Sequence, residues 1–519
     1  MVETHSSAGR FIPSWTLVTA LAVAGGVRAE VVVNGSGTRL EGNMAITADL
    51  GETRGGNLFH SFKVFNVLSG ESAMFSGPDS IRNVVSRVMG GTSGITGLKA
   101  SIIDGPVSLT IPNANFYFIN PSGIIFGEFG SIDATGSIYL GTADVVRFAD
   151  GSNFYADPAK SSVLTTADPV AFGFLSDSPA AIELDGPFLS DPVPPGKTFA
   201  LVAGDIDIQA ATYESAIIAP GATVSLASVA SAGNVALGNG AADLSGFASL
   251  GNIWMSGASF IDVGDGPTGT GAGSIYIRGG QLILSEAGSL AAQTFGDTGG
   301  GVIDIAVRGD LSMSSDPERG FASVIWTGSY GGLGAGAGIN LDVGGTLQVN
   351  GASFIRSESY GPGAAGDVHI RAGGIEIHGE GPGGAFTGIT ADNYDVAAGP
   401  SLTIDVGRLQ VLNGGIVGTL NLGEGSGGDM TITADSILAT GTGDVTLSLS
   451  TETRGGPAGN LSLNTRTLEL RDGARVSSST DGFGDAGDVN IVATQQISIE
   501  GDLSGIFSAT SATDARVGN

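Results

Sequence analysis

The chain has 519 residues, more than one compact hydrophobic core can serve, so its length predicts several domains or a repetitive rod. Glycine contributes 87 residues, whereas aromatic residues make up 7% and charged residues 14%, which is typical of short strands joined by many tight turns. The net charge of −29 argues against a nucleic-acid partner, and the lack of cysteine excludes disulfides and a thiol nucleophile.

The first segment is an apolar run at residues 11–27, which ends in small residues and is followed by Arg28 and Ala29. This pattern predicts a secretory signal peptide over residues 1–29, with cleavage between Ala29 and Glu30. An uncleaved anchor, or a start codon assigned too far upstream, is the alternative. Removal of the signal peptide leaves 20 basic residues (22 − 2) and 50 acidic ones (51 − 1), a balance that suits solubility outside the cell.

Two of the most apolar runs in the chain lie between Phe116 and Phe126, where Asn-Pro-Ser-Gly interrupts them, "FYFINPSGIIF". In a hairpin with one solvated face, the flanking strands would alternate between apolar and polar residues. These strands do not alternate. We therefore expect residues 120–123 to form a corner between two strands of one coil, with an extra element that covers the outer face of both.

A short motif that starts with glycine and continues as an alternating strand recurs through the second half of the chain. Its eight copies begin at Gly273, Gly301, Gly338, Gly366, Gly399, Gly428, Gly459 and Gly487. The intervals are 28, 37, 28, 33, 29, 31 and 28 residues, so the repeat is close to thirty residues long. Each repeat contains about three short strands of period two, and no helical period competes with them.

Repeats of this size cannot bury an apolar face alone, so they must stack on one another. Stacking in register produces parallel sheets with inward ladders of Val, Ile and Leu. The predicted fold is therefore an all-β parallel β-helix. A β-sandwich is disfavoured because it needs roughly 100 residues per unit. A propeller blade needs roughly 40 to 50 residues and a circular closure, and neither is indicated.

Four blocks in the N-terminal half resemble a known family in their order and spacing. They are "GGNLFHSFKVFNV" at residues 55–67, "IRNVVSRVMGGTSGITG" at 81–97, "FYFINPSGIIFGEFGSIDATGSIYLGTADVVRFADG" at 116–151 and "PGKTFALVAGDIDI" at 195–208. The family is that of the two-partner-secretion exoproteins, which are similar to filamentous haemagglutinin. The resemblance covers residues 30–250, and the later repeats look like the passenger rods of this family.

The resemblance implies export and surface display, without catalysis and without a cofactor. Residues 30–250 would form a capped, right-handed parallel β-helical secretion domain. In the periplasm of a Gram-negative-type bacterium, POTRA domains of an outer-membrane β-barrel transporter would recognise this domain. Residues 251–519 would form the repeat rod, whose lack of a terminal polar cap is expected of a truncated region.

The family's secretion motif, Asn-Pro-Asn-Gly-Ile, matches one stretch of this chain, with serine in place of the second asparagine. The matching residues are Asn120, Pro121, Ser122, Gly123 and Ile124. A second Asn-Pro motif of the family is absent.

One tripeptide in the repeat region, Arg308-Gly309-Asp310, spells an integrin-type adhesion motif. Other repeats place similar glycine-containing tripeptides, at residues 278–280 and 344–346, at the same corner between two strands. We therefore interpret the tripeptide as a corner, with adhesion as the alternative.

The function that these patterns favour is that of a secreted or surface-held adhesin, with host-cell, neighbouring-cell or glycan ligands. One alternative is a toxin whose effector lies beyond Asn519. Another is a β-helical polysaccharide-degrading enzyme, which needs basic residues and carboxylates converging on one sheet face. No such concentration is visible. His369 and His378 are expected at solvent-facing strand positions, so neither a metal site nor a catalytic residue is predicted.

Overall fold

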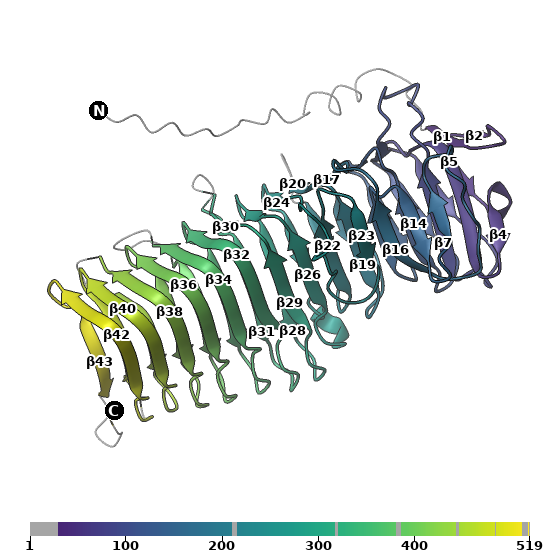
Figure 1. The fold of residues 1–519 in the computed structure, drawn as a ribbon. Coiled ribbons are helices and arrows are strands. Elements are labelled where there is room, and N and C mark those ends of the chain that lie inside the picture. The colour runs from purple at the N-terminus through teal and green to yellow at the C-terminus, as the bar shows by residue number, and fades with distance from the viewer. Residues whose placement is uncertain are drawn as a thin grey trace, which may run out of the picture.

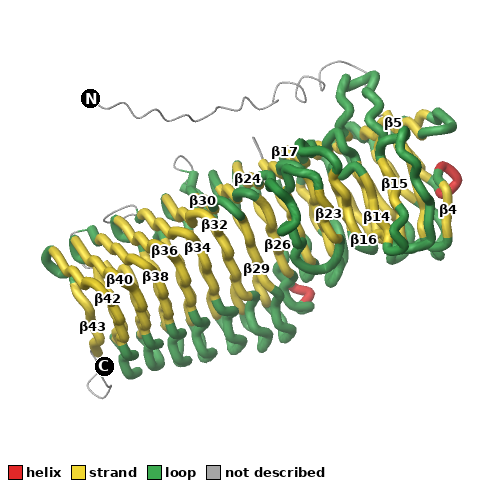
Figure 2. The backbone as a smooth tube through the Cα atoms, in the orientation of Figure 1, coloured by secondary structure: helices red, strands yellow, loops and turns green. Residues whose placement is uncertain are grey.

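The computed structural model describes residues 30–209, 215–316, 320–379, 386–442, 446–482, 484–510 and 517. These residues form strands joined by turns and loops, together with two short 3-10 helices, η2 (Ala48–Leu50) and η3 (Gly266–Thr268). Figure 1 shows the strands stacked side by side along an elongated rod, and Figure 2 shows the turns gathered along its edges. The predicted all-β parallel β-helix is confirmed.

Each coil of the rod contributes strands to three faces, and strands of the same face pair in parallel from coil to coil. The first face contains β5 (Asn57–Asn66), β7 (Asn83–Val88), β10 (Asn115–Ile119), β13 (Ile138–Gly141), β19 (Thr198–Ala203), β22 (Thr223–Ser228), β26 (Ser274–Gly279) and β29 (Val302–Val307). The second face contains β8 (Ser101–Ile103), β11 (Ile124–Phe126), β17 (Ile182–Asp185), β20 (Ile206–Gln209), β24 (Ile253–Ser256), β27 (Leu282–Leu284) and β30 (Leu311–Met313).

The third face is built from two consecutive parallel sheets. Near the N-terminus it contains β3 (Asn43–Ile46), β6 (Ser72–Phe75), β9 (Pro106–Leu109) and β12 (Ser131–Ala134). The second sheet contains β18 (Phe188–Ser190), β21 (Ala216–Ile218), β25 (Phe260–Asp262), β28 (Ser289–Thr294), β31 (Val324–Ser329), β33 (Phe354–Ser359), β35 (Gly388–Asn393), β37 (Ile416–Asn421), β39 (Thr446–Thr453), β41 (Ala474–Thr480) and β43 (Gly505–Thr510).

The prediction of three short strands per repeat is correct only for the first coils of the repeat region. From Gly338 onward, one long strand runs through both the first and the second face, in β32 (Gly338–Asn350), β34 (Val368–His378), β36 (Leu402–Leu412), β38 (Met430–Thr440), β40 (Leu461–Arg471) and β42 (Val489–Glu500). Glycines occupy the bend in β32, β34 and β36, where the amide of Gly345 still bonds the carbonyl of Gly309 in the preceding coil (2.9 Å), whereas β38, β40 and β42 bend without a glycine.

The interior of the rod is filled by aliphatic ladders that run along its axis. In one ladder, each residue lies in register with its equivalent in the next coil, and all are at most 1% exposed: Leu282, Leu311, Leu347, Ile375, Leu409, Ile437 and Leu468. Burial of such side chains contributes about 1.5–3 kcal/mol each. The rod is therefore held by nearest-neighbour contacts between coils.

The first glycine of the repeated motif lies where one coil passes close to the next. A Cβ atom added at Gly428 would stand 1.8 Å from the carbonyl oxygen of Pro400, and one at Gly459 would stand 1.9 Å from that of Gly428. Gly338 is different, because the nearest atom to its Cβ would be the carbonyl oxygen of Asp367 at 3.4 Å. Close approach of two backbones thus accounts for most of these glycines.

Two antiparallel additions distinguish the N-terminal end of the rod. The strands β1 (Glu30–Val33), β2 (Arg39–Leu40) and β4 (Glu52–Arg54) pair with one another or with β5 and form the predicted cap. A separate antiparallel sheet contains β14 (Val145–Phe148), β15 (Asn153–Tyr155), β16 (Pro169–Phe174) and β23 (Gly233–Ala236), and we call it the covering sheet. Figure 1 shows it beside the first coils.

The covering sheet explains the apolar run that precedes the turn at residues 120–123. Outward-facing side chains of the first face, among them Phe59 and Tyr117, form a second hydrophobic cluster with Phe148 and Phe154 of the covering sheet. The ring centroids of Phe59 and Phe154 are 5.1 Å apart. The expected extra element is therefore present over β10. The expectation is wrong for β11, where Ile125 stays partly exposed because the covering sheet lies on the first face alone.

His60 is the one histidine in the described residues that is buried, at 1% exposed. It lies in β5, its Nε2 donates to the carbonyl oxygen of Thr47 (3.3 Å), and its Nδ1 has no partner in the described structure. Burial lowers the pKa of His60 from 6.5 to about 4. The folded protein thus keeps His60 neutral at a pH where the unfolded chain binds a proton.

We expect His60 to make folding sensitive to mild acid. The free energy of unfolding that depends on neutral His60 is fully present above pH 6.5. It falls by about 3 kcal/mol in total as the pH drops from 6.5 to about 4, because the unfolded chain binds the proton first. Urea unfolding of the wild type and of His60→Gln, compared at pH 7.5 and pH 4.5, measures this loss. Glutamine can still donate to Thr47 but does not titrate. A free-energy difference between the two proteins that is equal at both pH values would contradict the expectation.

Candidate secretion site

Residues 120–124, which we call the corner turn, connect β10 on the first face with β11 on the second. Asn120 is fully buried (0% exposed), and its Nδ2 donates to the carbonyl oxygen of Lys99 (3.1 Å) and to Oγ of Ser101 (3.0 Å). Its Oδ1 accepts the amide of Ser122 (2.9 Å), which closes the turn. The backbone amide of Asn120 donates to Gly141 of the following coil (3.0 Å). Asn120 therefore joins three coils.

The other residues of the corner turn divide into an outer and an inner set. Pro121 and Ser122 are partly exposed and form its outward surface. Gly123 has a φ of +112°, a region that favours glycine, and its amide donates to the carbonyl oxygen of Asn120 (3.0 Å). Ile124 is fully buried in the core. The predicted corner is thus present, with only Pro121 and Ser122 at the surface.

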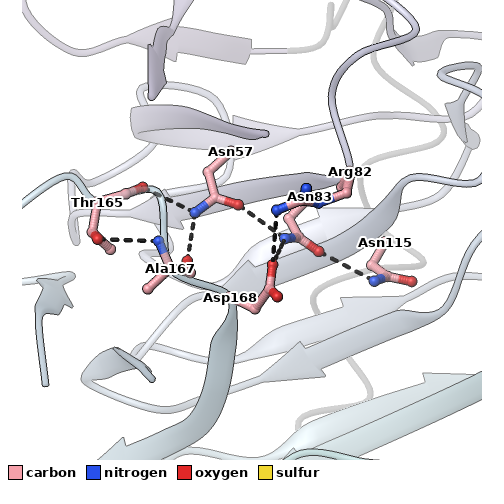
Figure 3. Close-up of polar contacts among 7 residues, drawn as sticks. All are labelled: Asn57, Arg82, Asn83, Asn115, Thr165, Ala167 and Asp168. Carbon is pink, nitrogen blue, oxygen red and sulfur yellow. Dashed lines mark hydrogen bonds and ion pairs between the residues drawn. The ribbon is translucent and has the colours of Figure 1, made fainter. Parts of the chain in front are cut away.

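A ladder of three asparagines, Asn57, Asn83 and Asn115, begins the first-face strands β5, β7 and β10, at the end of β10 opposite the corner turn (Figure 3). Nδ2 of Asn83 donates to Oδ1 of Asn57 (2.9 Å), and Nδ2 of Asn115 donates to Oδ1 of Asn83 (3.1 Å). Oδ1 of Asn115 accepts the amide of Ser137 in the next coil (2.9 Å). The ladder therefore holds four successive coils in register.

The same ladder fastens the segment that leads into the covering sheet. Nδ2 of Asn57 donates to the carbonyl oxygens of Thr165 (2.9 Å) and Ala167 (2.6 Å). Oδ1 of Asp168 accepts from Nδ2 of Asn83 (3.0 Å) and lies 3.6 Å from the guanidinium of Arg82, as Figure 3 shows. Sequence reasoning missed this ladder. Its signal was an asparagine directly before two apolar strand residues in "NLF", "NVV" and "NFY".

Glu30, the predicted first residue of the mature chain, is buried at 3% exposed and begins β1. Its Oε1 lies 3.0 Å from the guanidinium of Arg39, and its Oε2 accepts from Oγ of Ser93 and from the amide of Gly94, each at 2.9 Å. Residue 29, the other side of the predicted cleavage site, lies outside the described residues, as does the predicted signal peptide.

Residues 308–310, the candidate adhesion motif, lie between β29 and β30, at the corner that the repeats predict. The guanidinium of Arg308 donates to the carbonyl oxygens of Leu244 (2.9 Å) and Ala248 (3.3 Å). Oδ1 of Asp310 accepts the amide of Thr346 from the next coil (2.8 Å). Both charged side chains thus have structural partners.

In the described residues, no group of three or more potential ligands could hold a metal ion. His369 and His378 are exposed on β34, as expected of solvent-facing strand positions. None of the helices described in the structure has the length and apolarity needed to cross a membrane.

The family is decided by the N-terminal half of the rod. Residues 29–277 match the sequence profile of the TPS secretion domain, the domain that defines two-partner secretion. The chain is a two-partner-secretion exoprotein. As such, it is exported across the outer membrane of a Gram-negative bacterium, and its partner is a TpsB transporter.

Further comparisons concern single proteins. No curated protein matches the exoprotein significantly. Among solved structures, the crystal structure of the HMW1 secretion domain from Haemophilus influenzae matches with 14% sequence identity and a TM-score of 0.41. That match covers 91% of this chain and 97% of the other.

Proposed function

We propose that the exoprotein is an adhesin whose residues 30–250 direct export and whose residues 251–519 form the displayed rod. The observation that carries this division is the position of the covering sheet, which ends with β23 at Ala236. The coils that follow carry no such sheet in the described structure. Along their strands, buried apolar residues that point inward alternate with more exposed residues that point outward. A long series of similar bare faces suits multivalent contact with another surface.

We further propose that the corner turn is part of the signal read by POTRA domains of the TpsB partner. Pro121 and Ser122 support this role because they form its outward surface, whereas Asn120 is committed to holding the fold. After export, each coil that stacks on the previous one buries a further segment of the aliphatic ladders. Folding outside the cell then opposes backward sliding of the chain without nucleotide hydrolysis.

The experiment that tests this proposal is the intact mass of the product in the culture medium, from cells with and without the TpsB transporter. We expect a transporter-dependent species that begins at Glu30. A product retained in both strains would overturn the proposed export route, and a different N-terminus would overturn the cleavage site. Attachment of the purified exoprotein to host cells or to neighbouring bacteria, measured separately, tests the adhesive role; no attachment to either would contradict it.

The contribution of the corner turn is tested by the double variant Pro121→Ala/Ser122→Ala. These side chains are partly exposed, so we expect the purified variant to melt like the wild type but to be exported less efficiently. Normal export of this variant would remove the corner turn from the proposed signal. Ser122→Asn, which restores the residue of the family motif, is the matched control and should be exported at least as well as the wild type.

A further inference from the structure

The bare first face of the rod carries a cavity of about 430 Å³ on its outer surface, which we call the axial groove. It extends along β29, β32, β34, β36 and β38, which lie side by side in Figure 1. Two rows of outward side chains line it in register from coil to coil. One row contains Asn340, His369 and Thr403, and the other contains Asp342, Arg371 and Asp405.

Three charged side chains of the axial groove are unusual because they are not used by the fold. Arg371 stands in register between Asp342 and Asp405, yet no hydrogen bond or ion pair joins their side chains to any partner in the described part of the chain. Comparable neighbours do pair: Asp304, at the β29 end of the groove, pairs with Arg278 (2.8 Å), and Glu376, outside the groove, pairs with Arg408 (2.7 Å). The groove therefore presents free donors and acceptors.

The chemistry of these groups matches adjacent hydroxyl groups. Carboxylates, guanidinium and side-chain amides can each form two parallel hydrogen bonds, which suits a pair of neighbouring hydroxyls on a sugar ring. Equivalent residues recur once per coil, about every 4.8 Å, and an extended chain of pyranose rings advances by a similar distance per sugar. Tyr276 precedes Asp304 in the same outward row, so its partly exposed ring extends the groove with a surface on which a sugar can stack.

The negative charge of the groove determines whether it can bind a neutral or an anionic polysaccharide. Its two unpaired carboxylates, Asp342 and Asp405, outnumber the guanidinium of Arg371, and the whole exoprotein is strongly acidic. An anionic polysaccharide would be repelled. We propose that the axial groove binds a linear, neutral polysaccharide laid along the rod axis, with about one sugar per coil. This inference rests on the proposed adhesive function and supplies the ligand class for it.

The test uses the secreted, full-length exoprotein and isothermal titration with three hexasaccharides: cellohexaose, mannohexaose and hexagalacturonate. We expect binding to at least one neutral hexasaccharide and none to the acidic one. Arg371→Ala and Asp342→Ala should each weaken that binding at least tenfold, because each removes one partner of a hydroxyl pair. No binding to either neutral sugar, or preference for hexagalacturonate, would overturn the proposal.

The matched control is Asn464→Ala, an outward and exposed residue on β40, the strand that follows β38 on the same face. This variant should bind like the wild type, and equal weakening by all three substitutions would show that the groove is not the site. All variants should be exported normally and melt like the wild type. Export therefore reports on the proposed secretion function independently of sugar binding.

Discussion

Asn120→Ala should destabilise the secretion domain by about 3 kcal/mol. The substitution removes two donated hydrogen bonds and one accepted bond of a fully buried side chain, and it leaves the carbonyl oxygen of Lys99 and the hydroxyl of Ser101 without that partner. A buried polar group that loses its partner costs about 1–3 kcal/mol. Chemical unfolding of the purified wild type and variant, followed by hydrogen exchange at β8, β10 and β13, measures the change and shows which coils loosen.

The control for this prediction is Ser122→Ala, which alters the same turn but removes a partly exposed side chain with no hydrogen bond of its own in the described structure. It should unfold within about 0.5 kcal/mol of the wild type, as surface substitutions do. If Asn120→Ala were as stable as the wild type, the bonds of Asn120 would not hold the coils together. Comparison of the two variants also separates a folding defect from loss of a surface that the transporter reads.

Gly428→Ala should disrupt the rod locally, around β38. The added methyl group would stand 1.8 Å from the carbonyl oxygen of Pro400, so the two coils must move apart. Overpacking costs about 1–3 kcal/mol where side chains can adjust, and here the obstacle is backbone, so we expect at least about 3 kcal/mol. Because coils contact only their neighbours, the damage should stay near β36, β38 and β40. Limited proteolysis and hydrogen exchange would locate it.

Gly338→Ala is the matched control, since it changes the equivalent glycine of another repeat. Its methyl group would meet the carbonyl oxygen of Asp367 at 3.4 Å, an ordinary contact, and neither glycine has a positive φ. We expect Gly338→Ala to be neutral or slightly stabilising, because alanine restricts the unfolded chain. Equal protection from proteolysis in the two variants would show that close approach of the coils does not explain the repeated glycine.

The sequence alone determined the fold class. A short glycine-led motif that recurs about every thirty residues permits no other way to bury its apolar residues than stacking, and the inward ladder from Leu282 to Leu468 follows from that period. The corner at residues 120–123 was also predictable, because Pro121 and Gly123 restrict the backbone there and the flanking apolar runs require burial.

Contacts between residues far apart in the sequence were decided only by the tertiary structure. The asparagine ladder joins Asn57, Asn83 and Asn115 across coils; the asparagine before each strand is visible in the sequence, but the pattern does not show that these amides meet. The axial groove likewise depends on which outward residues fall in register, and a change of one residue in any corner would separate Asp342, Arg371 and Asp405. Short-range chemistry therefore determined the strands and corners, while the register between coils, which loop lengths set, determined the candidate sites.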